Sequence, residues 1–286
     1  MFTQKGYLMF LRILFTTLAL LFVQISVAQP MVGYFLSPQS ELSKGRTFKS
    51  IKETSEIFLK GIAVTPTRVE KEFNTLGNIT ASVTYNSAGG KTREVYWEYV
   101  NGENLVRKHT RSFVNLRGWQ EEEVILTWND DHSTPQKILV KKNGKVWQSA
   151  LFSSDSSRRF ESAEVFDSKG DHVFTERFTY IEASNIIKVM VFKANGAFHG
   201  TSTYPIDHKK PFTFESVAQT LYPNGDVMIE TLSNAVSGDQ AYYYEYEYDS
   251  QGNWIEKRTF QVKLGRGNRV RNKNLENKIS RTITYH

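Results

Sequence analysis

Apolar and polar residues alternate one by one along many short segments of this chain. Residues 242–248 show it most clearly, because one side of an extended backbone there carries only tyrosine, at Tyr242, Tyr244, Tyr246 and Tyr248. The same spacing puts Val124, Leu126 and Trp128 on one side, and Phe174, Phe178 and Tyr180 on another. A period of two residues is that of a β-strand. The pattern therefore predicts many strands, each with one aromatic side.

Turn signals separate these segments. Glycine recurs roughly every 27 residues, at positions 61, 90, 118, 144, 170, 196, 225 and 252, and a second cluster of Gly, Asn, Asp, Ser or Pro follows each of them. These residues favour turns because they tolerate positive φ, fix φ or bond their own backbone. We expect an all-β fold, with tandem antiparallel β-hairpins forming one large curved or rolled sheet of about sixteen strands. A β-propeller would need four strands per blade, and no such longer period is visible.

The first residues have the pattern of a secretory signal peptide. Lys5 and Arg12 precede an apolar run over residues 13–23, and small residues flank a cut after Ala28. The alternative is a membrane anchor, for which eleven apolar residues are short. No cysteine follows the cut, so a lipid anchor is not expected. We expect residues 1–28 to be removed and the protein to be exported to the periplasm, the cell surface or the extracellular space.

Residues 29–60 form an N-terminal lead-in to the repeats. Residues 31–36 are apolar, and we expect either a first strand or a tail packed on the core. In 48–59 the spacing of Phe48, Ile51, Ser55 and Phe58 predicts a short amphipathic helix or an extended lead-in, ended by Gly61. The β-hairpin repeat domain is then expected over residues 61–286.

Charge and cysteine content narrow the function classes. The chain has 286 residues, 36 Lys and Arg, 30 Asp and Glu, and a formal net charge of +6. Loss of the expected signal peptide, with its two bases, leaves +4, and the excess is spread along the chain. Only residues 263–278 are locally basic, so no nucleic-acid partner is expected. With no cysteine, neither disulfides nor thiolate metal sites can form.

A short motif runs through the repeats: an aromatic residue, Asn or Asp, two variable residues and Gly. It occurs at 73–77, 85–89, 166–170 and 248–252, with looser copies at 192–196 and 222–225. Over roughly residues 59–286 the chain resembles the YD-repeat proteins of bacteria, which are RHS-like secreted and surface proteins. The resemblance implies export and an array of β-hairpins. The arginine that usually follows the glycine is absent here, and the chain is too short to encapsulate a toxin.

Catalytic and metal-binding patterns are weak. The six histidines show no close pair of the kind that metal sites use, so neither a metal nor another cofactor is expected. Asp131, His132 and Ser133 are adjacent in one turn and cannot form a catalytic triad. Glu245 and Glu247 stand two residues apart on one strand, which leaves open a hydrolase of glycans or envelope polymers.

The tyrosine ladder, defined as Tyr242, Tyr244, Tyr246 and Tyr248 with Trp254 across the turn, is the candidate ligand-binding surface. Such a row is either the buried side of the sheet or an exposed surface that binds sugar rings or a protein. Residues 105–113 carry charge on both sides, unlike strands that face lipid, so no integral membrane protein is expected after signal cleavage. We predict a non-enzymatic binding or structural module at the bacterial cell envelope, with an envelope glycan or protein as its partner.

Overall fold

A computed structural model describes residues 30–36, 41, 43–59, 61–63, 66–130, 134–207, 217–232 and 240–286. The expected signal peptide and the turn at 131–133 lie outside these residues. Nearly all of the described chain is β-strand, and its α-helix α2 covers only Gly33–Leu36. Among the described residues, no helix is both long and apolar enough to cross a bilayer.

The described strands form one antiparallel sheet of 18 strands. Their bounds are β1 Phe48–Leu59, β2 Ile62–Ala63, β3 Thr67–Phe73, β4 Ile79–Tyr85, β5 Lys91–Val100, β6 Asn104–Val114, β7 Gly118–Trp128, β8 Pro135–Lys142, β9 Lys145–Ser154, β10 Phe160–Asp167, β11 His172–Ile181, β12 Ile186–Lys193, β13 Phe198–Pro205, β14 Val217–Leu221, β15 Val227–Leu232, β16 Gln240–Tyr248, β17 Trp254–Gly265 and β18 Arg269–Tyr285. Short 3-10 turns cover Glu182–Ser184 and Arg266–Asn268. The predicted all-β fold of tandem antiparallel hairpins in one curved sheet is confirmed.

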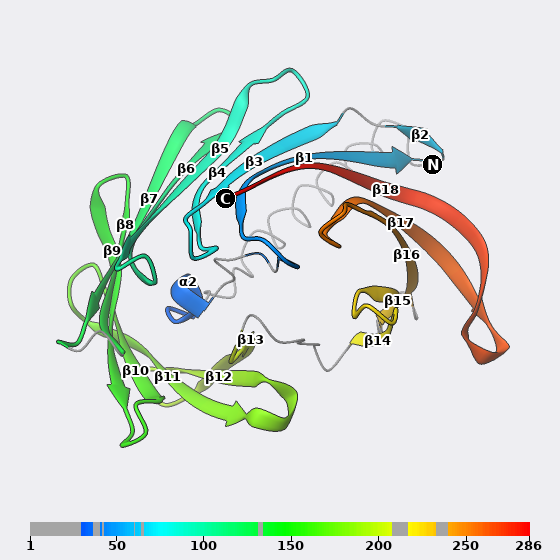
Figure 1. Ribbon diagram of the computed structural model, residues 1–286. Helices are drawn as coiled ribbons and strands as arrows, with labels where there is room; N and C mark the ends of the chain where they lie inside the picture. The colour runs from blue at the N-terminus through cyan, green and yellow to red at the C-terminus, as the bar shows by residue number, and fades with distance from the viewer. Residues whose placement is uncertain are drawn as a thin grey trace, which may run out of the picture.

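The sheet rolls into an incomplete ring (Figure 1). Strands β3 to β13 pair each with the next along the chain, and so do β14 to β18. β1 joins the two runs, because Ile51 lies opposite Lys71 of β3 on one side and Ile283 of β18 on the other. β13 and β14 are the two ends of the sheet, and it does not close into a barrel.

Of the two alternatives for residues 48–59, a short amphipathic helix or an extended lead-in, the extended one is confirmed, because this segment is the strand β1. Ile51, Glu53 and Ser55 point to the concave side, but only the first of these is apolar. Glu53 pairs there with Arg281, and the Ser55 hydroxyl bonds Asn277 at 3.1 Å. Because Glu53 and Ser55 occupy inward positions, apolar residues do not recur at every second position of this strand. The apolar residues that remain have the spacing of a helix by chance.

The core lies on the concave side of the sheet. Its largest cluster is built from the inward residues of neighbouring strands and from one residue of the lead-in: Leu105, Val124, Leu126, Ile138, Val140, Ala150, Val165 and Met31. A second cluster holds Phe48, Ile51, Phe73 and Ile79. Of the two alternatives for residues 31–36, the packed tail is confirmed, since α2 lies inside the ring (Figure 1).

The lead-in is fixed by two apolar side chains and one carboxyl. Met31 and Val32 are completely covered, and burial of such side chains stabilises a fold by about 1.5–3 kcal/mol each. Glu176 of β11 is 2% exposed and accepts the backbone N–H groups of Met31 at 2.5 Å and Val32 at 3.3 Å. Burial raises the pKa of Glu176 to about 7, although both N–H groups favour the charged form. The lead-in is thus bound to a buried carboxyl whose pKa lies near neutral pH.

The repeated motif is a turn in which the Asp or Asn side chain holds the backbone. The Asp167 carboxylate accepts the N–H groups of Lys169 at 2.8 Å and Asp171 at 3.0 Å, and Gly170 follows with a φ of 89°. The bond from Lys169 is the main cause that lowers the pKa of Asp167. Only glycine adopts such a φ without strain, which explains its place in the motif.

Candidate functional site

The tyrosine ladder faces the concave side of the sheet. Residues opposite each other on neighbouring antiparallel strands point to the same side of the sheet. Tyr246 of β16 pairs in this way with Lys257 of β17, and Lys257 pairs with Ile279 of β18. Ile279 in turn pairs with Ser55 of β1. Ser55 shares its side of β1 with buried Ile51. Exposure differs along the row: Tyr244 is 8% exposed, whereas Tyr248, beside the β16–β17 turn, is 37% exposed. The ladder is therefore buried at Tyr244, partly buried at Tyr242 and Tyr246, and open to solvent at Tyr248.

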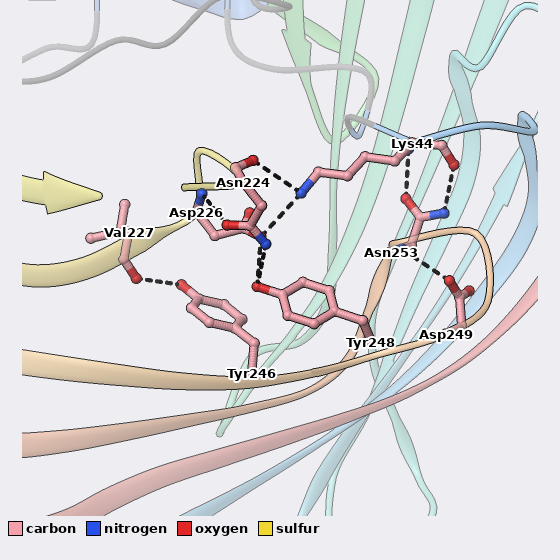
Figure 2. A network of polar contacts seen from close by, with 8 residues as sticks. All are labelled: Lys44, Asn224, Asp226, Val227, Tyr246, Tyr248, Asp249 and Asn253. Atoms are coloured by element: carbon pink, nitrogen blue, oxygen red, sulfur yellow. Dashed lines mark hydrogen bonds and ion pairs between the residues drawn. The ribbon is translucent and has the colours of Figure 1, made fainter. Parts of the chain in front are cut away.

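A polar network anchors the open end of the ladder (Figure 2). The Tyr248 hydroxyl donates to the Asp226 carboxylate at 2.8 Å and accepts from the Asn224 amide at 2.8 Å. The Tyr246 hydroxyl donates to the carbonyl oxygen of Val227 at 3.1 Å. Lys44 of the lead-in reaches the same Asp226 carboxylate at 3.1 Å. The turn between β14 and β15 is thus held against the end of β16.

Cations lie over the faces of the aromatic rings. The Lys257 ammonium is 4.5 Å from the ring centre of Tyr244, and the Arg281 guanidinium is 3.4 Å from that of Trp254. Burial lowers the pKa of Lys257 and raises that of Tyr244. Tyr246 and Tyr248 stack on each other with ring centres 6.0 Å apart. Cation–π contacts contribute to the stability of this wall, so part of the ladder is structural.

A pocket opens where β15 leaves β16. Pairing between the two strands ends at Ile229 and Tyr243, so residues 244–248 have no described strand on that side. The Tyr222 hydroxyl bonds the carbonyl oxygen of Tyr244 there at 2.8 Å. The resulting pocket has a volume of about 530 Å³ and is lined by Tyr222, Pro223, Asn224, Glu245, Tyr246, Glu247, Tyr248, Glu256 and Arg258.

The structure brings only two of the five predicted site residues, Tyr246 and Tyr248, to this pocket. Tyr242, Tyr244 and Trp254 lie beside it in the same wall. Sequence reasoning missed Tyr222 and Asn224, although their motif was recognised as a turn. Nothing in the motif indicates that this turn folds against the end of β16.

The pocket carboxylates are all ion-paired. Glu245 contacts Lys273 at 2.6 Å, and Glu247 contacts Arg258 at 2.8 Å. Glu256 also pairs with Arg258, and contacts Lys278 at 2.9 Å. Each acid of the pocket is therefore held by a lysine or an arginine.

No described group of three or more His, Asp or Glu side chains is close enough together to hold a metal ion. His132 and His208 lie outside the described residues. The residues that line the pocket offer aromatic faces, amide and hydroxyl groups, and paired charges.

Comparisons with known proteins give similarity of structure only. No protein-family model matches the chain, and no curated protein is similar to it in sequence. A solved porin-like protein of Bacteroides uniformis is 13% identical over 84% of this chain and 99% of its own, with a TM-score of 0.40. A porin-like protein of Bacteroides vulgatus is 7% identical over 85% of this chain and 99% of its own, with a TM-score of 0.27.

The Photorhabdus luminescens Tc holotoxin pore is 11% identical over 77% of this chain and 15% of that chain, with a TM-score of 0.32. These TM-scores are too low to transfer a function from any of the three proteins. The likeness to YD-repeat proteins accordingly remains a resemblance of sequence motif.

Proposed function

We propose that this protein is a non-enzymatic, exported β-repeat protein that binds a glycan of the bacterial cell envelope. The observation that carries the proposal is the pocket beside the open end of the tyrosine ladder. Its volume of about 530 Å³ lies within the usual range for small-molecule sites, about 300–1,000 Å³. Export rests on the sequence pattern of residues 1–28 and on the YD-like motif.

The chemistry of the pocket fits an uncharged sugar better than an ion. Tyr222, Tyr246 and Tyr248 supply aromatic surface, and Asn224 supplies an amide at the same place. The three acids of the pocket are balanced by three bases, Arg258, Lys273 and Lys278. A site without net charge does not favour a strongly anionic or cationic ligand. Aromatic faces and hydrogen-bonding groups together match the two kinds of surface that a sugar ring presents.

Calorimetric titration with oligosaccharides derived from peptidoglycan tests this function. We expect binding that raises the melting temperature, and Tyr248→Ala should weaken it about tenfold, since an aromatic contact at a binding site commonly contributes more than 1 kcal/mol. Tyr242→Ala is the matched control, because Tyr242 shares the strand and the concave side but does not line the pocket.

Equal loss of affinity in both tyrosine variants would show that the pocket is not the site. If no oligosaccharide raised the melting temperature, the glycan proposal would be wrong. Turnover of a polymer that Glu245→Gln or Glu247→Gln abolished would instead identify a hydrolase.

A further inference from the structure

The two ends of the ring differ in charge. In a sheet of consecutive antiparallel strands, successive turns alternate between the two ends. The turns at 86–90, 115–117, 143–144, 168–171 and 194–197 therefore share one end, here named the basic rim. With the residues directly beside them, they carry two acids, Asp167 and Asp171, and six bases: Lys91, Arg117, Lys142, Lys145, Lys169 and Lys193.

The opposite turns show the reverse balance. Their described residues carry two bases, Arg158 and Arg159, and five acids: Glu103, Asp130, Asp155, Glu182 and Asp207. On the basic rim, Lys91 is paired with Glu94. None of the other five bases has a described carboxylate at ion-pair distance, and Lys142 lies 4.4 Å over the ring of Trp147. The basic rim thus carries an excess of cations, most of them without a described carboxylate at ion-pair distance.

Large apolar side chains stand among these cations. Phe113 and Leu116 at the β6–β7 turn are 49% and 106% exposed, Trp147 after the β8–β9 turn is 50% exposed, and Phe198 after the β12–β13 turn is 62% exposed. All three turns belong to the basic rim. Exposed apolar residues gathered on one surface indicate a contact with a partner or a membrane.

Leu116 is the strongest sign that the rim has a partner. Its φ is +70°, a left-handed conformation that costs a leucine about 1–2 kcal/mol and that Asn or Gly adopts easily. Its side chain is fully exposed, so it contributes nothing to the core. Neither the turn nor the packing of this chain accounts for a leucine at this place.

We propose that the basic rim docks end-on to the surface of an anionic phospholipid bilayer. Lysines and arginines around exposed Trp, Phe and Leu side chains match the charged headgroups and the apolar layer below them. Only the turns enter the bilayer surface in this arrangement. The outer face of the strands behind them is polar and carries ion pairs, such as Arg107 with Glu98 and Lys141 with Glu123 at 3.2 Å, and such a face does not enter the apolar layer. This surface is separate from the glycan pocket and does not depend on it.

Co-sedimentation of the full chain with vesicles tests the proposal. We expect binding to vesicles of phosphatidylcholine with one quarter phosphatidylglycerol, little binding to pure phosphatidylcholine, and release at high salt. Leu116→Asn should lower the binding constant about tenfold, as expected for the loss of one buried leucine, and should leave the melting temperature unchanged or higher.

The matched control is Leu76→Asn, an exposed leucine (52%) in a turn at the opposite end of the ring, which should bind as the unchanged protein does. Joint replacement of Lys142, Lys145 and Lys193 by Gln should reduce binding to the level of the neutral vesicles. Absence of binding to anionic vesicles, or equal loss in both leucine variants, overturns the proposal. Equal binding to neutral and anionic vesicles overturns it as well.

Discussion

The buried carboxyl of Glu176 makes the stability of the fold depend on pH in an unusual direction. Its pKa rises from the ordinary 4.5 to about 7 in the folded chain, because burial disfavours the ionised form. Since one pKa unit corresponds to about 1.4 kcal/mol, folding favours the protonated form by about 3 kcal/mol. Below pH 4.5 the group is protonated in both states, and this contribution is complete. It is lost as the pH rises from 4.5 to about 7 and stays lost above that.

Glu176→Gln replaces the titrating group with a neutral one of the same shape. The glutamine carbonyl can still accept the backbone N–H of Met31, which lies 2.5 Å from the Glu176 carboxyl in the unchanged protein. The weaker hydrogen bond from the Val32 N–H, at 3.3 Å, is lost. We expect the variant to be slightly less stable than the unchanged protein at pH 4.5 and about 2 kcal/mol more stable at pH 8. The difference between the two proteins should change steadily between these values.

Urea unfolding followed by tryptophan fluorescence at pH 4.5, 6 and 8 measures this difference. Glu164→Gln is the control, because Glu164 is an exposed carboxyl one strand away on β10, and its replacement should leave the pH profile unchanged. A Glu176→Gln variant whose stability falls with pH in parallel with the unchanged protein would refute the assignment of the proton to Glu176.

Two further substitutions test how the concave side is held together. Asn253 is 5% exposed and bonds both backbone groups of Lys44, at 2.6 and 2.8 Å, so Asn253→Ala should cost about 2 kcal/mol in urea unfolding; an unchanged midpoint would contradict this anchoring role. The Arg281 guanidinium forms ion pairs with Glu53 at 2.9 Å and with Glu41 at 3.1 Å. Arg281→Gln should therefore lower the free energy of unfolding by about 2 kcal/mol, because two half-buried carboxylates lose this partner. Arg281→Lys keeps the charge and should lose less by thermal unfolding; equal losses would show that charge plays no part.

The sequence was sufficient where short-range chemistry decides the structure. An Asp such as Asp167 followed by Gly170 specifies a turn by its own hydrogen bonds, and the alternation of tyrosines along β16 specifies which side they share. Both signals lie within a few residues, so turns, strands and the aromatic side of the sheet followed from local pattern.

Long-range pairing could not be predicted in the same way. The pattern left β1 open between helix and extended lead-in, because its inward Glu53 looks like a surface residue until Arg281, 228 residues away, is beside it. Glu176 meets Met31 across 145 residues, and no local pattern marks that pair. The pocket was found only in part, because its wall at Tyr222 depends on where β15 separates from β16.

The first and last long strands along the chain do not lie at the edges of the sheet. The carbonyl oxygen of Thr47, just before β1, accepts the backbone N–H of His286, just after β18, at 3.1 Å, so β1 and β18 are bonded neighbours in the middle of the sheet. The sheet itself stops at β13 and β14, which are consecutive in the chain. A gene rearranged to begin at β14 and finish at β13, with the old ends linked, would encode the same ring with its chain breaks moved to its edges. In the natural order, by contrast, β1 cannot gain its second neighbour until β18 has been synthesised, so this part of the ring forms late.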